Sequence, residues 1–275
     1  MPKVNPPSGF LAGALARKRT EVERARRRRS GAELERLATE RPSARSLADA
    51  LRGQGVSVIA EVKRGSPSAG ALDAGIDAPA RARLYEERGA QAISVLTDAE
   101  FDGRLADLEA VAPAVSVPVL RKDFLVDPWQ VWESRAAGAD AALLIVAALD
   151  RSALDALVAE SAGAGLGLLI EIHGRAEARA AIDTGASVIG VNARDLSTLA
   201  VDADAALSTI EWLRREASDA VIVAESGIAD PEAVRRARDA GADAVLVGEH
   251  LSRATDPGDA LERLVAAGRE AGRSG

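Results

Sequence analysis

Cysteine is absent from the sequence. Its absence excludes disulfide bonds, thiolate metal sites, redox dithiols and every mechanism that uses a cysteine nucleophile. Histidine is scarce, with His173 and His250 as the only two. No set of His, Asp and Glu residues has a recognisable ligand spacing, so we expect no metal ion. His173 follows Glu171 by two residues, and this position fits either a general base or a polar residue in a loop.

Long apolar runs are also missing. The longest, residues 141–149, has nine residues, whereas a membrane-spanning helix needs about 20. The first residues lack the apolar segment of a secretory signal, so we expect a cytoplasmic protein with no membrane partner. The net charge is -7 and the pI is about 5.1. Such a chain repels nucleic acid as a whole, although a local basic patch can still bind a small anion.

Apolar residues make up 47% of the 275 residues, which is enough for a sizeable core. They gather in short runs rich in Val, Ile and Leu, a pattern typical of parallel strands that are covered on both faces. The eight predicted strands span residues 56–62, 91–96, 117–120, 141–146, 167–172, 188–191, 221–224 and 244–247.

The segments between these runs have helical spacing. Four of them end in a Gly-Ala pair, at residues 89–90, 138–139, 185–186 and 241–242, and glycine there suits a left-handed helix cap. Eight strand–helix units predict a (β/α)8 TIM barrel of the α/β class, which typically has about 250 residues. A doubly wound sheet is the alternative, but residues 61–66 do not form the glycine-rich dinucleotide loop that it would show after its first strand.

Residues 1–50 are expected to form an N-terminal helical extension, in which Ser30 and Glu33 make a capping box. We expect a single domain over residues 1–275, with the barrel at 56–270. Residues 24–29 are all arginine except Ala25. Helical spacing spreads these charges around a helix beside Glu21 and Glu23, so we interpret the run as a solvated face rather than a nucleic-acid site.

In a TIM barrel, the carboxyl-terminal ends of the strands carry the active site. Glu61 and Lys63 share one face of the first predicted strand, because side chains alternate along a strand. Lys122 stands at the end of the third strand and Glu171 at the end of the fifth. These groups are the candidate acids and bases.

Lysine is rare in this chain. Of the 35 basic residues only four are lysine, yet Lys63 and Lys122 both stand at strand ends, each beside an arginine. Lysine can lose its proton when it is desolvated and arginine effectively cannot. We therefore favour proton transfer at these two positions, while phosphate binding by Lys63 and ion pairing with Glu61 or Asp123 stay open.

The last three strand ends indicate an anion site. Ser226 and Gly227 follow the seventh strand and Gly248 follows the eighth, each ahead of a predicted helix. Backbone N–H groups and helix N-termini can converge on a phosphate there, and Arg194 can add a charge. The expected partner is a small phosphorylated molecule.

Seven sequence motifs follow one another at the strand ends, at residues 59–63 with 66–68, 93–97, 118–124, 143–147, 171–173, 190–194 and 225–228. These motifs closely resemble those of the indole-3-glycerol phosphate synthase family, from about Phe10 to Leu264. The resemblance implies closure of the indole ring of 1-(2-carboxyphenylamino)-1-deoxyribulose 5-phosphate, with loss of carbon dioxide and water and without a cofactor.

The resemblance also implies roles for individual residues. Lys122 matches the general acid that protonates the substrate carbonyl, and Glu171 matches its partner during dehydration. Glu61 and Lys63 match an acid–base and substrate-binding pair; how the two lysines divide the work stays open. The matching substrate contacts are Ser66 in the motif after the first strand, Phe124 at the anthranilate pocket, Asn192 and Glu225 at the hydroxyls and ring nitrogen, and Arg194, Ser226, Gly227 and Gly248 at the phosphate.

Two positions depart from the family pattern. Ala69 stands where a lysine is frequent in the loop after the first strand, and Arg104 stands where serine is usual. Neither change affects a proposed acid or base.

Phosphoribosylanthranilate isomerase is the nearest alternative, but its pattern requires a cysteine base, and histidine-pathway isomerases place aspartates where Glu61 and Glu171 stand. A non-catalytic barrel that binds a phosphorylated ligand is the remaining alternative. Oligomeric partners are not predicted.

Overall fold

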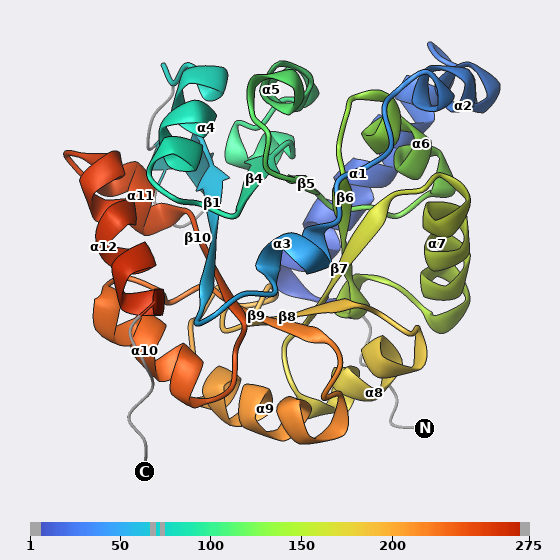
Figure 1. Ribbon diagram of the computed structural model, residues 1–275. Coiled ribbons are helices and arrows are strands. Elements are labelled where there is room, and N and C mark those ends of the chain that lie inside the picture. The colour runs from blue at the N-terminus through green and yellow to red at the C-terminus, as the bar shows by residue number, and fades with distance from the viewer. Residues whose placement is uncertain (1–6, 67–69, 72–74, 270–275) are drawn as a thin grey trace.

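The computed structural model describes residues 7–66, 70–71 and 75–269, and its centre is a closed barrel of eight parallel strands (Figure 1). The strands follow one another around the barrel in the order β1-β10-β9-β8-β7-β6-β5-β4. Their bounds are β1 Ser57–Val62, β4 Ala92–Leu96, β5 Val119–Lys122, β6 Ala141–Ile145, β7 Gly167–Ile172, β8 Val188–Asn192, β9 Val221–Glu225 and β10 Ala244–Val247. The predicted fold class is confirmed.

Three strands reach further along the chain than the apolar runs predicted. β5, β8 and β9 each continue into a polar residue, Lys122, Asn192 and Glu225 respectively. Lys122 pairs with Leu96 of β4 and Asn192 pairs with Glu225 of β9 in the ladder. Hydrophobicity alone ends a strand at its last apolar residue, whereas backbone pairing holds these polar groups on rigid strands.

Helices surround the barrel (Figure 1). Their bounds are α4 Ala78–Glu87, α5 Leu105–Val111, α6 Pro128–Ala136, α7 Arg151–Gly163, α8 Arg175–Asp183, α9 Ala203–Glu216, α10 Pro231–Asp239, α11 Glu249–Arg253 and α12 Pro257–Arg269. Asp127 and Asp230 are each followed by a proline, a sequence pattern typical of helix starts, and their side chains accept hydrogen bonds from the first turns of α6 and α10. The glycines of all four Gly-Ala pairs have positive φ, between 74° and 100°.

From residue 7 on, where the described structure begins, three helices precede the barrel: α1 Gly9–Arg26, α2 Gly31–Thr39 and α3 Leu47–Leu51. The N–H of Glu33 donates to the Ser30 side chain at the start of α2, which is one of the two hydrogen bonds of the expected capping box. The extension packs against the barrel interior, since Leu11, Leu15 and Leu51 join the apolar cluster formed by inward-facing strand residues. Backbone bonds from Phe10 and Leu11 to the loop after β8 place the start of α1 at the carboxyl-terminal end of the barrel.

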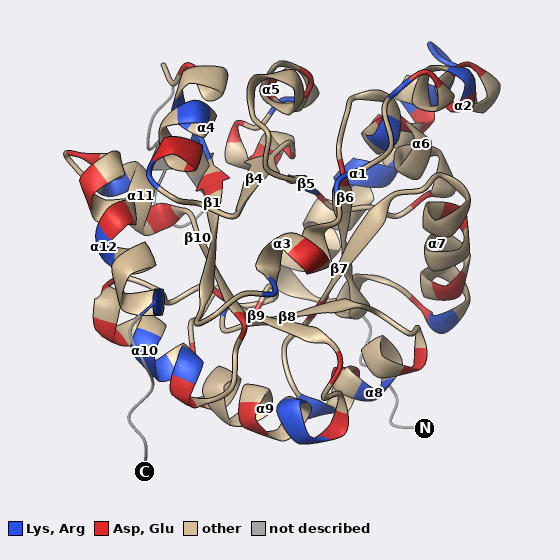
Figure 2. Cartoon of the chain, viewed as in Figure 1, with Lys and Arg blue, Asp and Glu red and all other residues tan. Residues whose placement is uncertain are grey.

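A second, larger apolar cluster lies between the outer faces of the strands and the surrounding helices. Charged residues of both signs gather on these helices, as Figure 2 shows. The arginines of residues 24–29 are exposed, as the solvated-face interpretation predicts. Within the described residues, no helix combines the length and apolar character needed to cross a membrane.

Candidate active site

A cavity opens at the carboxyl-terminal end of the barrel, where the sequence places the active site. Its walls include residues from the ends of all eight barrel strands and from the loops that follow them. Among the predicted site residues, those that line it are Glu61, Lys63, Lys122, Phe124, Glu171, Asn192, Arg194, Glu225, Ser226, Gly227 and Gly248. The tertiary fold thus brings together groups that are separated by up to 187 positions in the chain.

Lys122 lies at the centre of the charged part of this cavity. Its Nζ is 3.4 Å from Glu171 Oε2 and 3.4 Å from Glu225 Oε2. Lys63 Nζ lies 3.8 Å from Glu61 Oε1 on the same face of β1, as the strand alternation predicts. These separations are longer than the roughly 2.7–2.9 Å of a close charge-assisted hydrogen bond. The groups are therefore close enough to exchange a proton through a substrate atom without being locked to one another.

Burial and charge set the protonation of this cluster. Burial and the neighbouring Glu171 raise the pKa of Glu225 to about 8, although Lys122 opposes them. Burial also acts to raise the pKa of Glu171, but Lys122 and His173 outweigh it and hold that pKa below its ordinary value. Burial acts to lower the pKa of Lys122, and the three carboxylates of Glu171, Glu225 and Glu61 reverse this, so its pKa is raised.

Near neutral pH the cluster therefore contains acids and a base together. Lys122 is an ammonium, Glu225 is protonated and Glu171 is a carboxylate. Within the described residues, both oxygens of Glu225 and Oε1 of Glu171 are buried without a hydrogen-bond partner. Buried polar atoms are rarely left unpaired. Their hydrogen-bonding capacity is available to a ligand in the cavity.

The side chains of the two strand-end lysines point into the barrel, whereas those of the neighbouring arginines point outward. Lys63 and Lys122 enter the cavity, whereas Arg64 bonds Asp107 of α5 through two nitrogens, both at 2.8 Å. Arg121 bonds Asp123 and reaches Glu133 of α6, outside the barrel. Successive strand residues face opposite sides, which explains this separation. The chain places lysine inside and arginine outside at both strand ends.

The residues that are predicted to bind the phosphate lie at the ends of β8, β9 and β10, across the barrel from Lys122 on β5. Ser226 and Gly227 have positive φ, 63° and 73°, and left-handed backbone is uncommon for serine. Arg194 also lines this side, and its guanidinium contacts Glu249 Oε2 at 3.4 Å and donates to the Leu199 carbonyl at 3.1 Å. An anion here would compete with Glu249 for Arg194.

The structure explains why position 248 is a glycine, which the sequence alone did not. A Cβ at this position would lie 2.3 Å from Glu61 Oε1, so the carboxylate of Glu61 occupies the space that a side chain would need. Gly190, in the middle of β8, has the same relation to Glu225, whose Oε1 would lie 2.0 Å from its Cβ. Glycine inside a strand often marks such a close approach. Gly190 was missed as a site residue although this signal was present.

Other predicted positions have less direct outcomes. Ser66 belongs to the two-residue strand β2 (Gly65–Ser66), which pairs with β3 (Gly70–Ala71), and its contact with a ligand stays a prediction. Ala69 lies outside the described residues. Arg104 is exposed at the start of α5 and makes no side-chain cap there.

His173 lies just outside the cavity wall. Its Nε2 is 3.6 Å from Glu171 Oε1, and its Nδ1 is 3.4 Å from Glu177. Burial lowers its pKa, but the hydrogen bond to Glu177 and the charge of Glu171 outweigh burial and raise it. Because His173 contacts Glu171 and does not line the cavity, it fits a residue that acts on Glu171 better than a general base that contacts the substrate.

Sequence reasoning also missed several residues of the cavity wall. Asp98 and Phe101 follow β4 and line the cavity beside Lys63. Leu143 and Ile145 of β6 are buried and also line the cavity. In the described parts of the chain, no group of three or more His, Asp and Glu side chains is arranged to hold a metal ion.

Comparison with known proteins places the chain in a family. The family model described as indole-3-glycerol phosphate synthase matches residues 11–264. An indole-3-glycerol phosphate synthase of Streptomyces griseus is 52% identical over 238 residues, covering 86% of this chain and 87% of the relative. The enzyme of that name from Mycobacterium avium is 46% identical over 263 residues, covering 95% of this chain and 96% of the relative.

Solved structures with low sequence identity share the fold. 3-Hexulose-6-phosphate synthase has a TM-score of 0.63 at 18% identity, covering 77% of this chain and 99% of that one. Thiamine phosphate pyrophosphorylase from Pyrococcus furiosus has a TM-score of 0.58 at 18% identity, covering 81% and 97% respectively. These structures share only the barrel fold with this chain, whereas the family model and the relatives of 46–52% identity match most of its length: the chain belongs to the indole-3-glycerol phosphate synthase family.

Proposed function

We infer that this chain converts 1-(2-carboxyphenylamino)-1-deoxyribulose 5-phosphate into indole-3-glycerol phosphate, with loss of carbon dioxide and water. It is a carboxy-lyase of tryptophan biosynthesis. The observation that supports this most directly is one cavity in which Lys122 lies 3.4 Å from both Glu171 and Glu225. Ring closure needs an acid at a carbonyl oxygen, and dehydration then needs a base and an acid together.

The first step is bond formation between the ring carbon that carries the carboxylate and the substrate's carbonyl carbon. We assign to the Lys122 ammonium the proton that the carbonyl oxygen takes up as this bond forms. Loss of carbon dioxide then returns the bonding electrons to the ring. The side chain of Phe124, which is 5% exposed and lines the cavity, supplies an apolar wall for the aromatic ring.

Dehydration follows at the newly formed carbon–carbon bond. The hydroxyl must leave as water and a proton must be removed from the neighbouring carbon. We assign the removal of this proton to the Glu171 carboxylate, whose lowered pKa keeps it ionised. Lys122 gave up its proton in the first step, so it takes up another from solvent water before it protonates the hydroxyl, which then leaves as water. It lies 3.4 Å from both Glu171 and Glu225. Glu225, protonated at neutral pH, serves as a hydrogen-bond donor to the substrate.

The phosphate is assigned to the opposite side of the cavity. Arg194, Ser226, Gly227 and Gly248 line that side, and α11 begins directly after Gly248. Positive charge and free backbone N–H groups favour an anion at such a place. The distance between the phosphate and the reacting carbons is then set by the width of the barrel, so the substrate spans the cavity.

Turnover of the synthesised substrate tests this function. Purified protein with that substrate and no added metal or nucleotide should produce the ultraviolet and fluorescence signature of indole, and a chelator should leave the rate unchanged. Absence of product would reject the assigned reaction, and complete loss with chelator would reject its independence of metal. The expectations of a cytoplasmic location and of no nucleic-acid partner stay predictions.

A further inference from the structure

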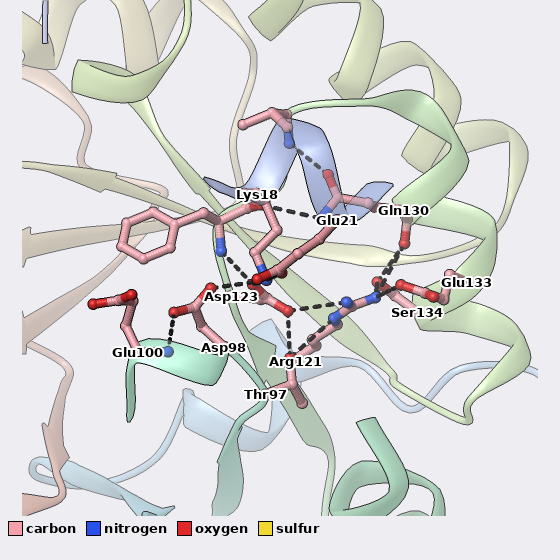
Figure 3. A network of polar contacts seen from close by, with 12 residues as sticks. Lys18, Glu21, Thr97, Asp98, Glu100, Arg121, Asp123, Gln130, Glu133 and Ser134 are labelled. Atoms are coloured by element: carbon pink, nitrogen blue, oxygen red, sulfur yellow. Dashed lines mark hydrogen bonds and ion pairs between the residues drawn. The ribbon is translucent and has the colours of Figure 1, made fainter. Parts of the chain in front are cut away.

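Lys18 is the one described lysine that the proposed chemistry does not use. It lies on α1, outside the barrel strands, and its side chain is only 6% exposed. Three carboxylates surround its ammonium (Figure 3): Asp98 Oδ2 and Asp123 Oδ1 at 2.8 Å and Glu21 Oε2 at 2.9 Å. A buried ammonium is costly unless it is paired and hydrogen-bonded. An arginine-rich chain that buries a lysine here has a specific use for a compact charge.

The two aspartates lie at the ends of neighbouring strands. Asp98 follows β4 and Asp123 follows β5, and both line the cavity. Asp123 stands between Lys122 and Phe124 in the chain, and its Oδ1 accepts the N–H of Phe124 at 2.8 Å as well as the Lys18 ammonium. Lys18 thus holds the segment from which the proposed general acid enters the cavity.

Asp123 is also fixed from its other oxygen. Its Oδ2 accepts from Thr97 Oγ1 at 2.6 Å and from Arg121 at 2.9 Å (Figure 3). Burial acts to raise the pKa of Asp123, but Arg121 and Lys18 outweigh it and keep the pKa low. The carboxylate is therefore ionised and fully engaged, with cations on both sides. Loss of either cation leaves one of its oxygens with only a neutral donor, the Phe124 N–H or the Thr97 hydroxyl.

A second line of contacts runs from α1 to Lys63. Arg17 of α1 pairs with Glu100 at 2.6 Å, and the Phe10 ring meets the edge of Phe101 with centroids 6.3 Å apart. Lys63 Nζ lies over the Phe101 ring, 5.6 Å from its centroid. Glu100 and Phe101 belong to the short helix η1 (Ala99–Phe101), which Asp98 caps. The aspartate that Lys18 holds is thus the start of the segment that supports Lys63.

We propose that Lys18 is a positioning residue for the proposed reaction: its ammonium ties the ends of β4 and β5 together and so holds both strand-end lysines at the substrate. The proposal rests on the proposed function. Without Lys18, Asp98 and Asp123 are two buried carboxylates facing the same space, and their repulsion pushes the two strand ends apart. A displacement of about 1 Å at reacting groups can cost on the order of a hundredfold in rate.

Lys18→Met tests the proposal, because methionine keeps much of the length and apolar stem but removes the charge. The measurements are kcat and KM with the synthesised substrate, the inhibition constant of inorganic phosphate, and the melting curve by circular dichroism. We expect kcat to fall by roughly ten- to a hundredfold. The inhibition constant of inorganic phosphate should stay within about twofold of wild type, because the predicted phosphate-binding residues follow β8, β9 and β10, whereas Lys18 contacts the ends of β4 and β5. General loosening of the fold would weaken both.

Arg26→Met is the matched control. Arg26 is also on α1 and loses an ion pair of the same length, the 2.8 Å contact with Asp127 at the start of α6. This pair is more exposed and involves neither Asp98 nor Asp123. Its kcat should stay within about twofold of wild type. Lys18→Arg, which restores a cation between the aspartates, should recover part of the lost kcat.

Three results would overturn the proposal: kcat within twofold of wild type in folded Lys18→Met, an equal loss of kcat and phosphate affinity, or an equal loss in Arg26→Met. If Lys18→Met does not fold, Lys18→Gln replaces it, because an amide removes the charge but still offers a hydrogen-bond donor to the aspartates, and the same outcomes decide. No turnover by wild-type protein would instead reject the proposed function, so the two failures are distinguishable.

Discussion

Two buried lysines of this chain, Lys18 and Lys122, each face three carboxylates but are bound in different ways. The three contacts of Lys18 measure 2.8 to 2.9 Å, whereas Lys122 lies 3.4 Å from its two nearest carboxylates. Around Lys122, carboxylate oxygens in the described structure are buried without hydrogen-bond partners. Asp123, beside Lys18, uses both of its oxygens.

This difference separates a group that holds the structure from a group that acts on a ligand. Saturated ion pairs fix a geometry, but a proton cannot leave a fully bonded group without a large loss of energy. A cluster with loose contacts and unused acceptors is less favourable in the empty protein and can bond to a substrate instead. In this chain, the proposed catalytic group Lys122 is thus the one with long contacts and unused acceptors around it, and the supporting group Lys18 is the one whose ammonium is fully paired.

The largest effect is expected at Lys122, where a substitution can distinguish proton donation from a purely electrostatic role. Lys122→Arg keeps the positive charge, but the pKa of arginine is too high for ready proton donation. We expect kcat to fall by roughly 10² to 10⁴, the usual contribution of a positioned acid or base, while a substrate analogue still binds. Measurement of kcat and analogue affinity, with circular dichroism as folding control, decides. Near wild-type kcat would shift the acid role to Lys63.

The next effect concerns stability and compares the two lysines directly. Lys18→Met leaves Asp98 and Asp123 without their shared cation, and loss of one partner from a buried ion pair costs about 3–5 kcal/mol of unfolding free energy. Lys122→Met should cost clearly less, because Glu225 is already protonated and Glu171 can take up a proton. Urea unfolding of both variants provides the values. Equal losses would remove the distinction between support and active group.

A smaller effect is expected at Gly248. In Gly248→Ala, the new Cβ would lie 2.3 Å from Glu61 Oε1 and 3.1 Å from Glu61 Cβ. The carboxylate of Glu61 can rotate away but β1 must also shift slightly, so we expect a small loss of stability. The displaced carboxylate leaves Lys63 without its 3.8 Å partner, and kcat should fall together with phosphate affinity. Gly163→Ala is the control, because nothing lies within 4 Å of its Cβ. A change in KM alone would indicate that Gly248 serves only the phosphate.

The smallest effect is a slope of stability with pH. Because the pKa of Glu225 is raised to about 8 in the folded chain, from an ordinary value of about 4.3, the folded state holds an extra proton between these values. Its stability must therefore fall as pH rises through this range. The raised pKa of His173 acts in the same direction.

Glu225→Gln isolates the contribution of Glu225 to this slope. Glutamine does not titrate, so the decrease in melting temperature between pH 5 and pH 8 should be smaller in the variant than in wild type. Lys122 and Glu171 face the same group and remain in both proteins. Identical slopes would mean that Glu225 is not protonated in the empty cavity, and the account of its role as a donor would be wrong.

The sequence by itself determined the barrel and the candidate acids and bases. Apolar runs, Gly-Ala helix ends and Asp-Pro helix starts are local signals, since they report burial and backbone conformation within a few residues. Strand alternation and the rarity of lysine then identified Lys63 and Lys122, and the family motifs assigned their partners. Each of these inferences needs only neighbours along the chain.

The tertiary structure decided what these residues touch. The packing of α1 against the β4 and β5 ends buries Lys18 among Asp98 and Asp123, which lie 80 and 105 positions further along the chain. The space taken by Glu61 beside Gly248 and by Glu225 beside Gly190 is likewise a contact between distant segments. Protonation follows the same rule, because burial and charges from other strands set the pKa of Glu225. Such properties arise only when the barrel closes.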